Sequence, residues 1–154
     1  MTAGDFFGEL RSLVGGGILF DFPTEAQWEF ACRAGTTTRF YTGATGDTDR
    51  NRLGVSMGGQ GSAPEKVGKY LPNAFGLYDM YSNAAEWCLD RHADYTADAV
   101  TDPVGPSTGD KRVYRGSAYN STYSAKTGAT TGRGSAIANG GSSTYACRLW
   151  CPAD

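Results

Sequence analysis

The chain has 154 residues and a formal net charge of −2, and its basic residues form no run or stripe. Length and composition predict one domain over residues 1–154 that buries most of its apolar surface. Nucleic-acid-binding proteins carry a basic patch that contacts the phosphates. This chain has none, so we do not expect it to bind nucleic acid. No apolar stretch is long enough to span a bilayer and the N-terminus lacks a signal-peptide pattern, so we expect no membrane insertion; cytosol, virion and cell surface stay open as locations.

Two helices are predicted near the N-terminus. Residues 5–14 place apolar side chains on one helical face, which is typical of a short amphipathic helix. Residues 25–34 give the clearest helix, because Thr24 is a good N-cap and Gln27 completes a capping box. A short strand is expected between the helices, at residues 18–22.

The middle of the chain is rich in turns and poor in periodicity. Residues 36–64 are expected to form a long loop with one strand near Phe40, and residues 92–110 a second loop. A short strand at 66–70 and a turn at 73–76 lie between these loops. With 22 glycines, the pattern favours a loop-rich α+β fold of short antiparallel strands and two helices over a parallel α/β sheet.

Four cysteines and one histidine are the candidates for zinc or nucleophilic chemistry. The cysteines lack zinc-ribbon spacing and His92 has no neighbouring nucleophile, so we expect neither a four-ligand zinc site nor a histidine-based catalytic site. Free, partly buried thiols are the simpler interpretation. The cysteines are Cys32, Cys88, Cys147 and Cys151. The tryptophans expected in the core are Trp28, Trp87 and Trp150.

The most unusual stretch is residues 117–145, in which nearly every residue is Ser, Thr, Ala, Gly, Asn or Tyr. Predicted strands at 112–116 and 146–150 lie on either side of it. Flexible linkers have this composition, and so do binding surfaces with diversified side chains. Because a linker would not lie between two strands of one fold, we favour a binding surface over a linker.

Four segments resemble, in order, the signatures of formylglycine-generating-enzyme (sulfatase-modifying factor) domains: residues 22–36, 72–88, 109–117 and 147–149. The resemblance implies a C-type lectin-like fold in its formylglycine-generating-enzyme version. That fold hosts more than one kind of function, so the function has to be argued from the site.

One function implied by the resemblance is a copper oxidase that acts on a peptide cysteine. In those enzymes a redox-active cysteine pair follows the third signature and a copper ion is used. The matching region here, residues 117–145, contains no cysteine. Ser and Tyr cannot replace a thiolate as copper ligand or redox nucleophile, so this alternative is disfavoured.

The chain more closely resembles the variable proteins of diversity-generating retroelements, which share the fold. Their C-terminal segment is rewritten at template adenines, chiefly in AAC-type codons, and within 117–145 only Lys126 lies outside the residues such codons reach. The resemblance implies a non-enzymatic, monomeric binder that requires no cofactor and recognises a variable macromolecule, in our interpretation a protein on a cell or virus surface. A capsid or tail component whose Ser/Thr/Gly-rich end packs on a neighbour is a structural alternative.

Two sets of site residues are expected. Tyrosines among small polar residues have the chemistry of a paratope, since Tyr offers a large contact area at low entropic cost. The ligand-binding residues expected within 117–145 are Ala118, Tyr119, Ser121, Thr122, Tyr123, Thr127, Thr130, Thr131, Ser135, Ile137, Asn139, Ser142, Ser143 and Tyr145. By resemblance, a structural calcium ion would be held by Asp79, Ser82, Ala84 and Glu86. The alternative for Asp79 and Glu86 is turn capping or a salt bridge.

Overall fold

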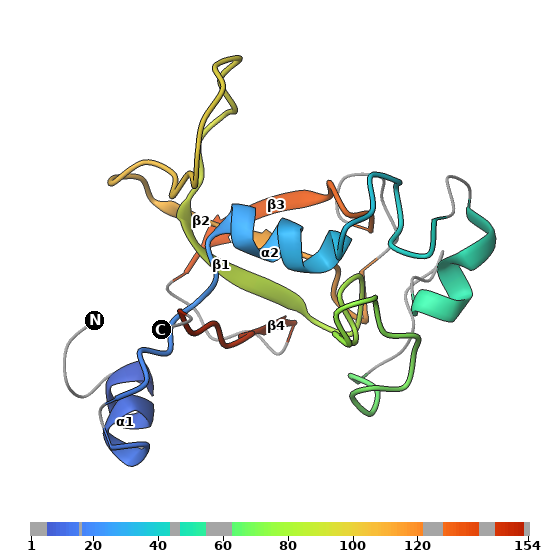
Figure 1. The fold of residues 1–154 in the computed structure, drawn as a ribbon, viewed down its shortest axis with the longest axis horizontal. Helices are drawn as coiled ribbons and strands as arrows, with labels where there is room; N and C mark the ends of the chain where they lie inside the picture. Colours follow the sequence, from blue (N-terminus) through green and yellow to red (C-terminus); the bar gives the residue numbers. More distant parts are fainter. Residues whose placement is uncertain are drawn as a thin grey trace.

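A computed structural model describes residues 6–15, 17–43, 47–54, 63–121, 128–138 and 144–152 (Figure 1). Within these ranges, no helix is both long and apolar enough to cross a membrane. The helices are α1 (Phe6–Leu13), α2 (Glu25–Arg33) and the 3-10 helix η1 (Asp47–Leu53). The strands are β1 (Ala85–Arg91), β2 (Lys111–Arg115), β3 (Arg133–Ile137) and β4 (Tyr145–Ala146).

The four strands form one mixed sheet in the order β3-β2-β1-β4. β1 pairs antiparallel with β2, and β2 with β3, whereas β4 runs parallel to β1. The expectation of an α+β fold with two helices is therefore confirmed, but the sheet is not purely antiparallel. α2 lies across β1 and β2 and covers one face of the sheet (Figure 1).

Helix α2 forms as its sequence predicts. The Thr24 hydroxyl accepts the Gln27 amide, and the Gln27 side chain accepts the Thr24 amide, which completes the capping box. The helix ends at Ala34, which adopts the left-handed conformation with φ 46°. Trp28 and Cys32 face the sheet and are buried.

The core lies between α2, the sheet and the long loop that follows α2. Tyr81 is at its centre: its ring stacks on Tyr41 at 4.8 Å and meets Phe40 edge-on at 5.4 Å. The Tyr81 hydroxyl accepts the Tyr41 amide and shares a 2.8 Å hydrogen bond with Thr130. Phe40 and Leu53 anchor the described parts of residues 36–64 in this core. The predicted strand near Phe40 is wrong, since this stretch forms bends and turns.

Other strand predictions need correction. Residues 18–22 contribute only one bridge, from Asp21 to Trp150, and residues 66–70 form a turn. The strand expected at 146–150 is reduced to β4 and that bridge. Conversely, β3 was not expected, because the sequence Arg-Gly-Ser-Ala-Ile has no apolar alternation that predicts a strand. β3 lies inside residues 117–145, which we call the biased segment. This segment is therefore partly built into the sheet.

Candidate functional site

The sheet has a second face, opposite α2, which we call the outer face. Strand residues alternate between the two faces, and Glu86, Cys88 and Asp90 are buried on the α2 side of β1. Trp87 therefore points to the outer face. Its partner in the register is Tyr114 on β2, and the partner of Tyr114 is Gly134 on β3.

Three rings on this face form what we call the aromatic cluster: Trp87, Tyr114 and Tyr145. Trp87 stacks on Tyr145 with ring centroids 4.5 Å apart and an interplanar angle of 25°. Tyr114 meets Tyr145 edge-on at 5.2 Å and Trp87 at 6.1 Å. All three side chains are half-buried, and burial raises the pKa of Tyr145, with a further contribution from Tyr114.

The cluster changes how two aromatic residues are interpreted. Trp87 was expected in the core, but it shares the outer face with a predicted ligand-binding residue, Tyr145. Tyr114 has no sequence signal of its own, and only the alternation of the strand predicted over 112–116 places it on the face opposite Val113 and Arg115. Trp28 is in the core as expected, whereas Trp150 is half-buried.

Gly134 is required beneath the cluster. A Cβ at this position would lie 2.2 Å from Cζ of Tyr114 and within 2.5 Å of its hydroxyl oxygen. The Tyr114 ring therefore extends over β3, in a space that only glycine leaves open. This contact ties the position of an aromatic ring to the backbone of the biased segment.

A polar hollow of about 90 Å³ lies beside the cluster. Tyr114 and Tyr145 form one side, and Ser117, Asn120, Ser121 and Thr144 contribute hydroxyl and amide groups. Asn120 and Ser121 are exposed in a turn closed by the bond from the Ser121 amide to the Ala118 carbonyl, 2.9 Å. The hollow is therefore lined both by scaffold residues and by residues from the two ends of the biased segment.

Not all predicted ligand-binding residues reach the surface. Thr130 has no exposed area: its hydroxyl meets Tyr81 and donates to the Arg39 carbonyl at 2.7 Å. Ala118 and Tyr119 are each only 8% exposed. The assignment of Thr130 to the binding surface is therefore wrong, and Ala118 and Tyr119 are packing residues, because the segment needs its own anchors in the core.

The remaining predicted residues divide between locations. Ser121 and Thr131 are exposed. Ser135 is half-buried and Ile137 is 53% exposed, and their register with Val113 and Lys111 places them on the α2 side of β3, away from Tyr145. The predicted residues outside the described parts of the chain are Thr122, Tyr123, Thr127, Asn139, Ser142 and Ser143; Lys126 also lies there.

A buried ion network fixes the biased segment to α2. Glu25 accepts hydrogen bonds from Arg115 at 3.0 Å, from Arg133 at 3.0 Å and from the Tyr95 hydroxyl at 2.8 Å. Arg115 is fully buried, pairs also with Glu29 at 2.6 Å and lies over the Trp28 ring. The two carboxylates raise the pKa of Arg115 although burial opposes this, so the guanidinium stays charged.

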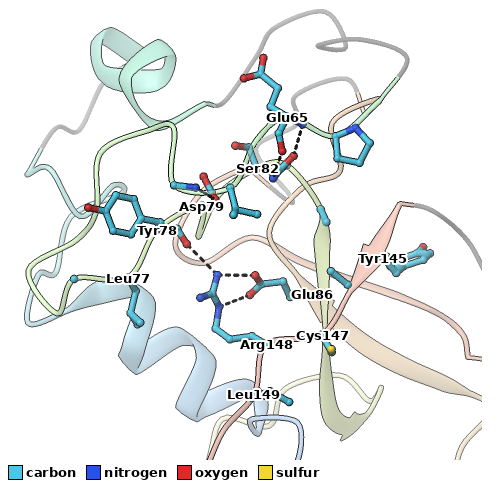
Figure 2. A pocket seen from close by; sticks show the side chains of 17 residues that line it. Glu65, Leu77, Tyr78, Asp79, Ser82, Glu86, Tyr145, Cys147, Arg148 and Leu149 are labelled. Carbon is cyan, nitrogen blue, oxygen red and sulfur yellow. Dashed lines mark hydrogen bonds and ion pairs between the residues drawn. The ribbon is translucent and has the colours of Figure 1, made fainter. Parts of the chain in front are cut away.

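The proposed calcium residues lie along a groove of about 780 Å³ (Figure 2). Both Glu86 oxygens are occupied: Arg148 donates to them at 2.6 and 2.8 Å, and the Trp28 indole donates at 2.7 Å. Asp79 accepts the Gly68 amide through one oxygen, while its other oxygen is buried without a hydrogen-bond partner. Among the four, only Asp79 offers a free carboxylate oxygen.

As placed, this set does not fit a calcium ion. The Arg148 guanidinium pairs with the Glu86 carboxylate and donates to the Tyr78 carbonyl at 3.0 Å. Its positive charge would repel a calcium ion at the same carboxylate. The Ser82 carbonyl accepts the Ala84 amide at 3.0 Å, so one of the two backbone ligands is also engaged. For Glu86 the salt-bridge alternative is the one the structure shows.

The four cysteines are free. Cys32 and Cys88 are buried, and burial raises the pKa of Cys32 to about 12 and shifts the pKa of Cys88 upward as well. These thiols are poor sources of thiolate at neutral pH. Cys147 and Cys151 are exposed at the C-terminal end. The described residues contain no cluster of three or more His, Cys, Asp or Glu side chains suited to a metal.

Among solved structures, Treponema denticola variable protein 1 superposes with a TM-score of 0.75 at 35% identity, over 86% of this chain and 47% of that chain. PvdO from Pseudomonas aeruginosa superposes with a TM-score of 0.72 at 20% identity, over 93% of this chain and 56% of that chain, which shows the fold alone. The first of these is a variable protein, in agreement with the resemblance that the sequence motifs predict.

Among curated proteins, the formylglycine-generating enzyme of Thermomonospora curvata is 34% identical over 115 residues, covering 63% of this chain and 37% of that enzyme. The enzyme of Streptomyces coelicolor is 35% identical over 112 residues, covering 63% and 35%. The chain thus spans little more than a third of the length of these relatives. Residues 4–145 match the family model described as the sulfatase-modifying factor enzyme 1-like domain, and the chain therefore belongs to that family.

Proposed function

We propose that this chain is a non-enzymatic ligand-binding protein with a C-type lectin-like fold, and that residues 117–145 are diversified by a retroelement to recognise varied protein targets on a cell or virus surface. The similarity to a variable protein at 35% identity supports this assignment. So does the composition of the segment, in which only Lys126 lies outside the residues reached from AAC-type codons.

The observation that carries the proposal is how the segment is held. Ala118 and Thr130 are buried and pack into the core, and the partly buried Arg133 pairs with Glu25. Exposed positions such as Thr131 lie between these anchors and contribute nothing to them. The backbone can then stay fixed while exposed side chains change, and a pre-organised surface loses less entropy on binding.

A second candidate is a copper oxidase acting on a peptide cysteine, because the curated relatives include formylglycine-generating enzymes. The segment in which the enzymes carry their cysteine pair has no cysteine here. The buried Cys32 and Cys88 do not compensate, since their pKa values are raised. A copper titration with a cysteine-containing peptide tests this candidate: we expect neither stoichiometric copper binding nor turnover, and observing both would establish the enzyme.

Sequencing of related gene copies tests the proposed function. We expect substitutions to cluster at codons 117–145, with a near-copy of that coding region nearby that carries adenines at the differing bases. Within the segment, the buried Thr130 and the ion-paired Arg133 should vary less than the exposed Ser121 and Thr131. Substitutions spread evenly along the chain would reject diversification.

A further inference from the structure

Helix α1 packs on none of the other helices and strands that the structure describes, and Figure 1 shows it set apart from α2 and the sheet. Two contacts hold it to the chain that follows. The Phe7 ring meets the Phe22 ring edge-on at 4.8 Å, and the Arg11 guanidinium donates to the Phe20 carbonyl at 2.6 Å. The helix ends at Gly15, whose φ of 82° turns the chain back. α1 is therefore held to its own connecting segment and not to the core.

The outward side of α1 is apolar. Phe6 and Leu13 lie seven residues apart on one helical face, and both are exposed, Leu13 to 84%. Val14, Ile18 and Leu19 follow the helix and are also exposed. We call α1 with these three residues the arm. Five large apolar side chains exposed on one short segment mark an interaction surface, whereas the apolar residues of an ordinary surface are scattered singly.

A second exposed apolar surface lies on the side of α2 that faces away from the sheet. It is a groove of about 580 Å³, which we call the α2 groove. Phe30 and Phe75, whose ring centroids are 5.8 Å apart, line it together with Val104 and Trp150. Phe30 is 69% exposed, and Phe75 and Val104 are exposed as well. Among the residues described along this groove only Asp102 is charged, so the groove suits an apolar occupant.

The arm and the α2 groove match in size. The groove volume is roughly four times the 150 Å³ of a cavity that takes benzene, so it has room for about four apolar side chains of the arm. At about 100 Å² each, the exposed apolar side chains of arm and groove offer on the order of 800 Å² per chain. Two chains that exchange arms would cover about 1,600 Å², which is the size of a stable protein–protein interface.

We infer that the chain forms a symmetric dimer in which the arm of each copy lies in the α2 groove of the other. Because one chain carries both halves of the contact, a single two-fold axis covers both exposed surfaces in both copies. The inference does not depend on the proposed function, and it replaces the monomer that the resemblance implies with a dimer. The contact lies on the α2 side of the sheet, so the outer face stays open in each copy.

Sedimentation equilibrium of the whole chain between about 1 and 100 μM tests the inference. We expect the mass to rise from that of one chain toward that of two. Leu13→Asp in the arm and Phe30→Asp in the groove should each weaken association about tenfold or more, because each places an unpaired carboxylate in the contact. Both side chains are exposed in the single chain, so the variants should fold, and near-UV circular dichroism checks this.

Val67→Asp is the matched control, because the exposed Val67 lines the separate groove that contains Asp79 and should change association by less than about twofold. A mixture of the Leu13→Asp and Phe30→Asp chains combines one intact arm with one intact groove, so it should associate more strongly than either variant alone. A mass of one chain at every concentration would overturn the dimer. Sensitivity to Leu13→Asp alone, to Phe30→Asp alone or to neither, or a mixture no stronger than its parts, would overturn the placement of the arm in the groove.

Discussion

Replacing Arg133 with alanine tests whether a residue inside the biased segment belongs to the scaffold. Arg133 donates to Glu25 at 3.0 Å and to the Ala93 carbonyl at 2.6 Å, and its guanidinium lies 4.3 Å from the centre of the Tyr95 ring. Its side chain is 16% exposed and that of Glu25 8%, so solvent screens the pair only weakly. The substitution leaves Glu25 paired with Arg115, so no isolated charge is buried.

The expected loss follows from these contacts. A hydrogen bond involving a charged group contributes about 1.5–3 kcal/mol, and a partly exposed cation–π contact about 1 kcal/mol. Since the partners relax and water replaces part of the bonding, we expect Arg133→Ala to lower the free energy of unfolding by about 3 kcal/mol. Arg133→Lys keeps the charge but cannot reach both Glu25 and Ala93 with a fork of donors, so about half that loss is expected.

Urea denaturation followed by tryptophan fluorescence provides the measurement, with the slope against urea checked for constancy. Thr131→Ala is the control, because this exposed neighbour in the same segment should change stability by less than about 0.5 kcal/mol. Combining Arg133→Ala with Glu25→Gln in a double-mutant cycle isolates the pair. A loss below about 0.5 kcal/mol for Arg133→Ala, or no coupling to Glu25, would refute the scaffold role.

Three further outcomes are expected. Gly134→Ala should lower the free energy of unfolding by about 1–3 kcal/mol in the same urea assay, because its methyl group would overlap the Tyr114 ring and force it to shift; an effect below about 0.5 kcal/mol would contradict the packing described. Calcium at about 1 mM should leave the melting temperature within about 1 °C of that in EGTA, and a rise of several degrees would show that the salt bridge of the groove opens to admit the ion. Iodoacetamide at about pH 8 should alkylate the exposed Cys147 and Cys151 in the folded protein, whereas the buried Cys32 and Cys88 should react only after unfolding, as mass spectrometry would show. Rapid labelling of Cys32 and Cys88 in the folded protein would contradict their raised pKa values.

Helix α2 and the sheet show which parts of this fold are readable from sequence. α2 is specified locally, since Thr24 and Gln27 satisfy each other's backbone amides whatever lies around them. β3 is specified by partners far along the chain: β2 provides its hydrogen bonds and Glu25 holds Arg133. A strand of small residues carries no periodic signal of its own, so tertiary pairing alone reveals it.

The candidate site was predictable to a similar, limited extent. Composition identified residues 117–145 as unusual, but composition does not say which side chains face outward. Thr130 and Ser121 have similar chemistry, yet the first is buried under Arg39 and Tyr81 and the second is exposed. Trp87 was misplaced for a related reason, because a single strand's alternation gives two faces and only the position of α2 decides which one is the core.

The network around Glu25 explains how a segment of such low complexity is held in place. Most residues of the segment are small and uncharged and provide few strong anchors, so the contacts that hold it depend on a few charged side chains. Here they come from Arg115 before the segment, from Glu25 on α2 and from Arg133 within it. Substitution of Arg133 by serine or asparagine would remove one of the two cations that neutralise Glu25. Substitution at the exposed Thr131 or Ser121 leaves these ion pairs in place, whereas substitution at Arg133 removes one of them.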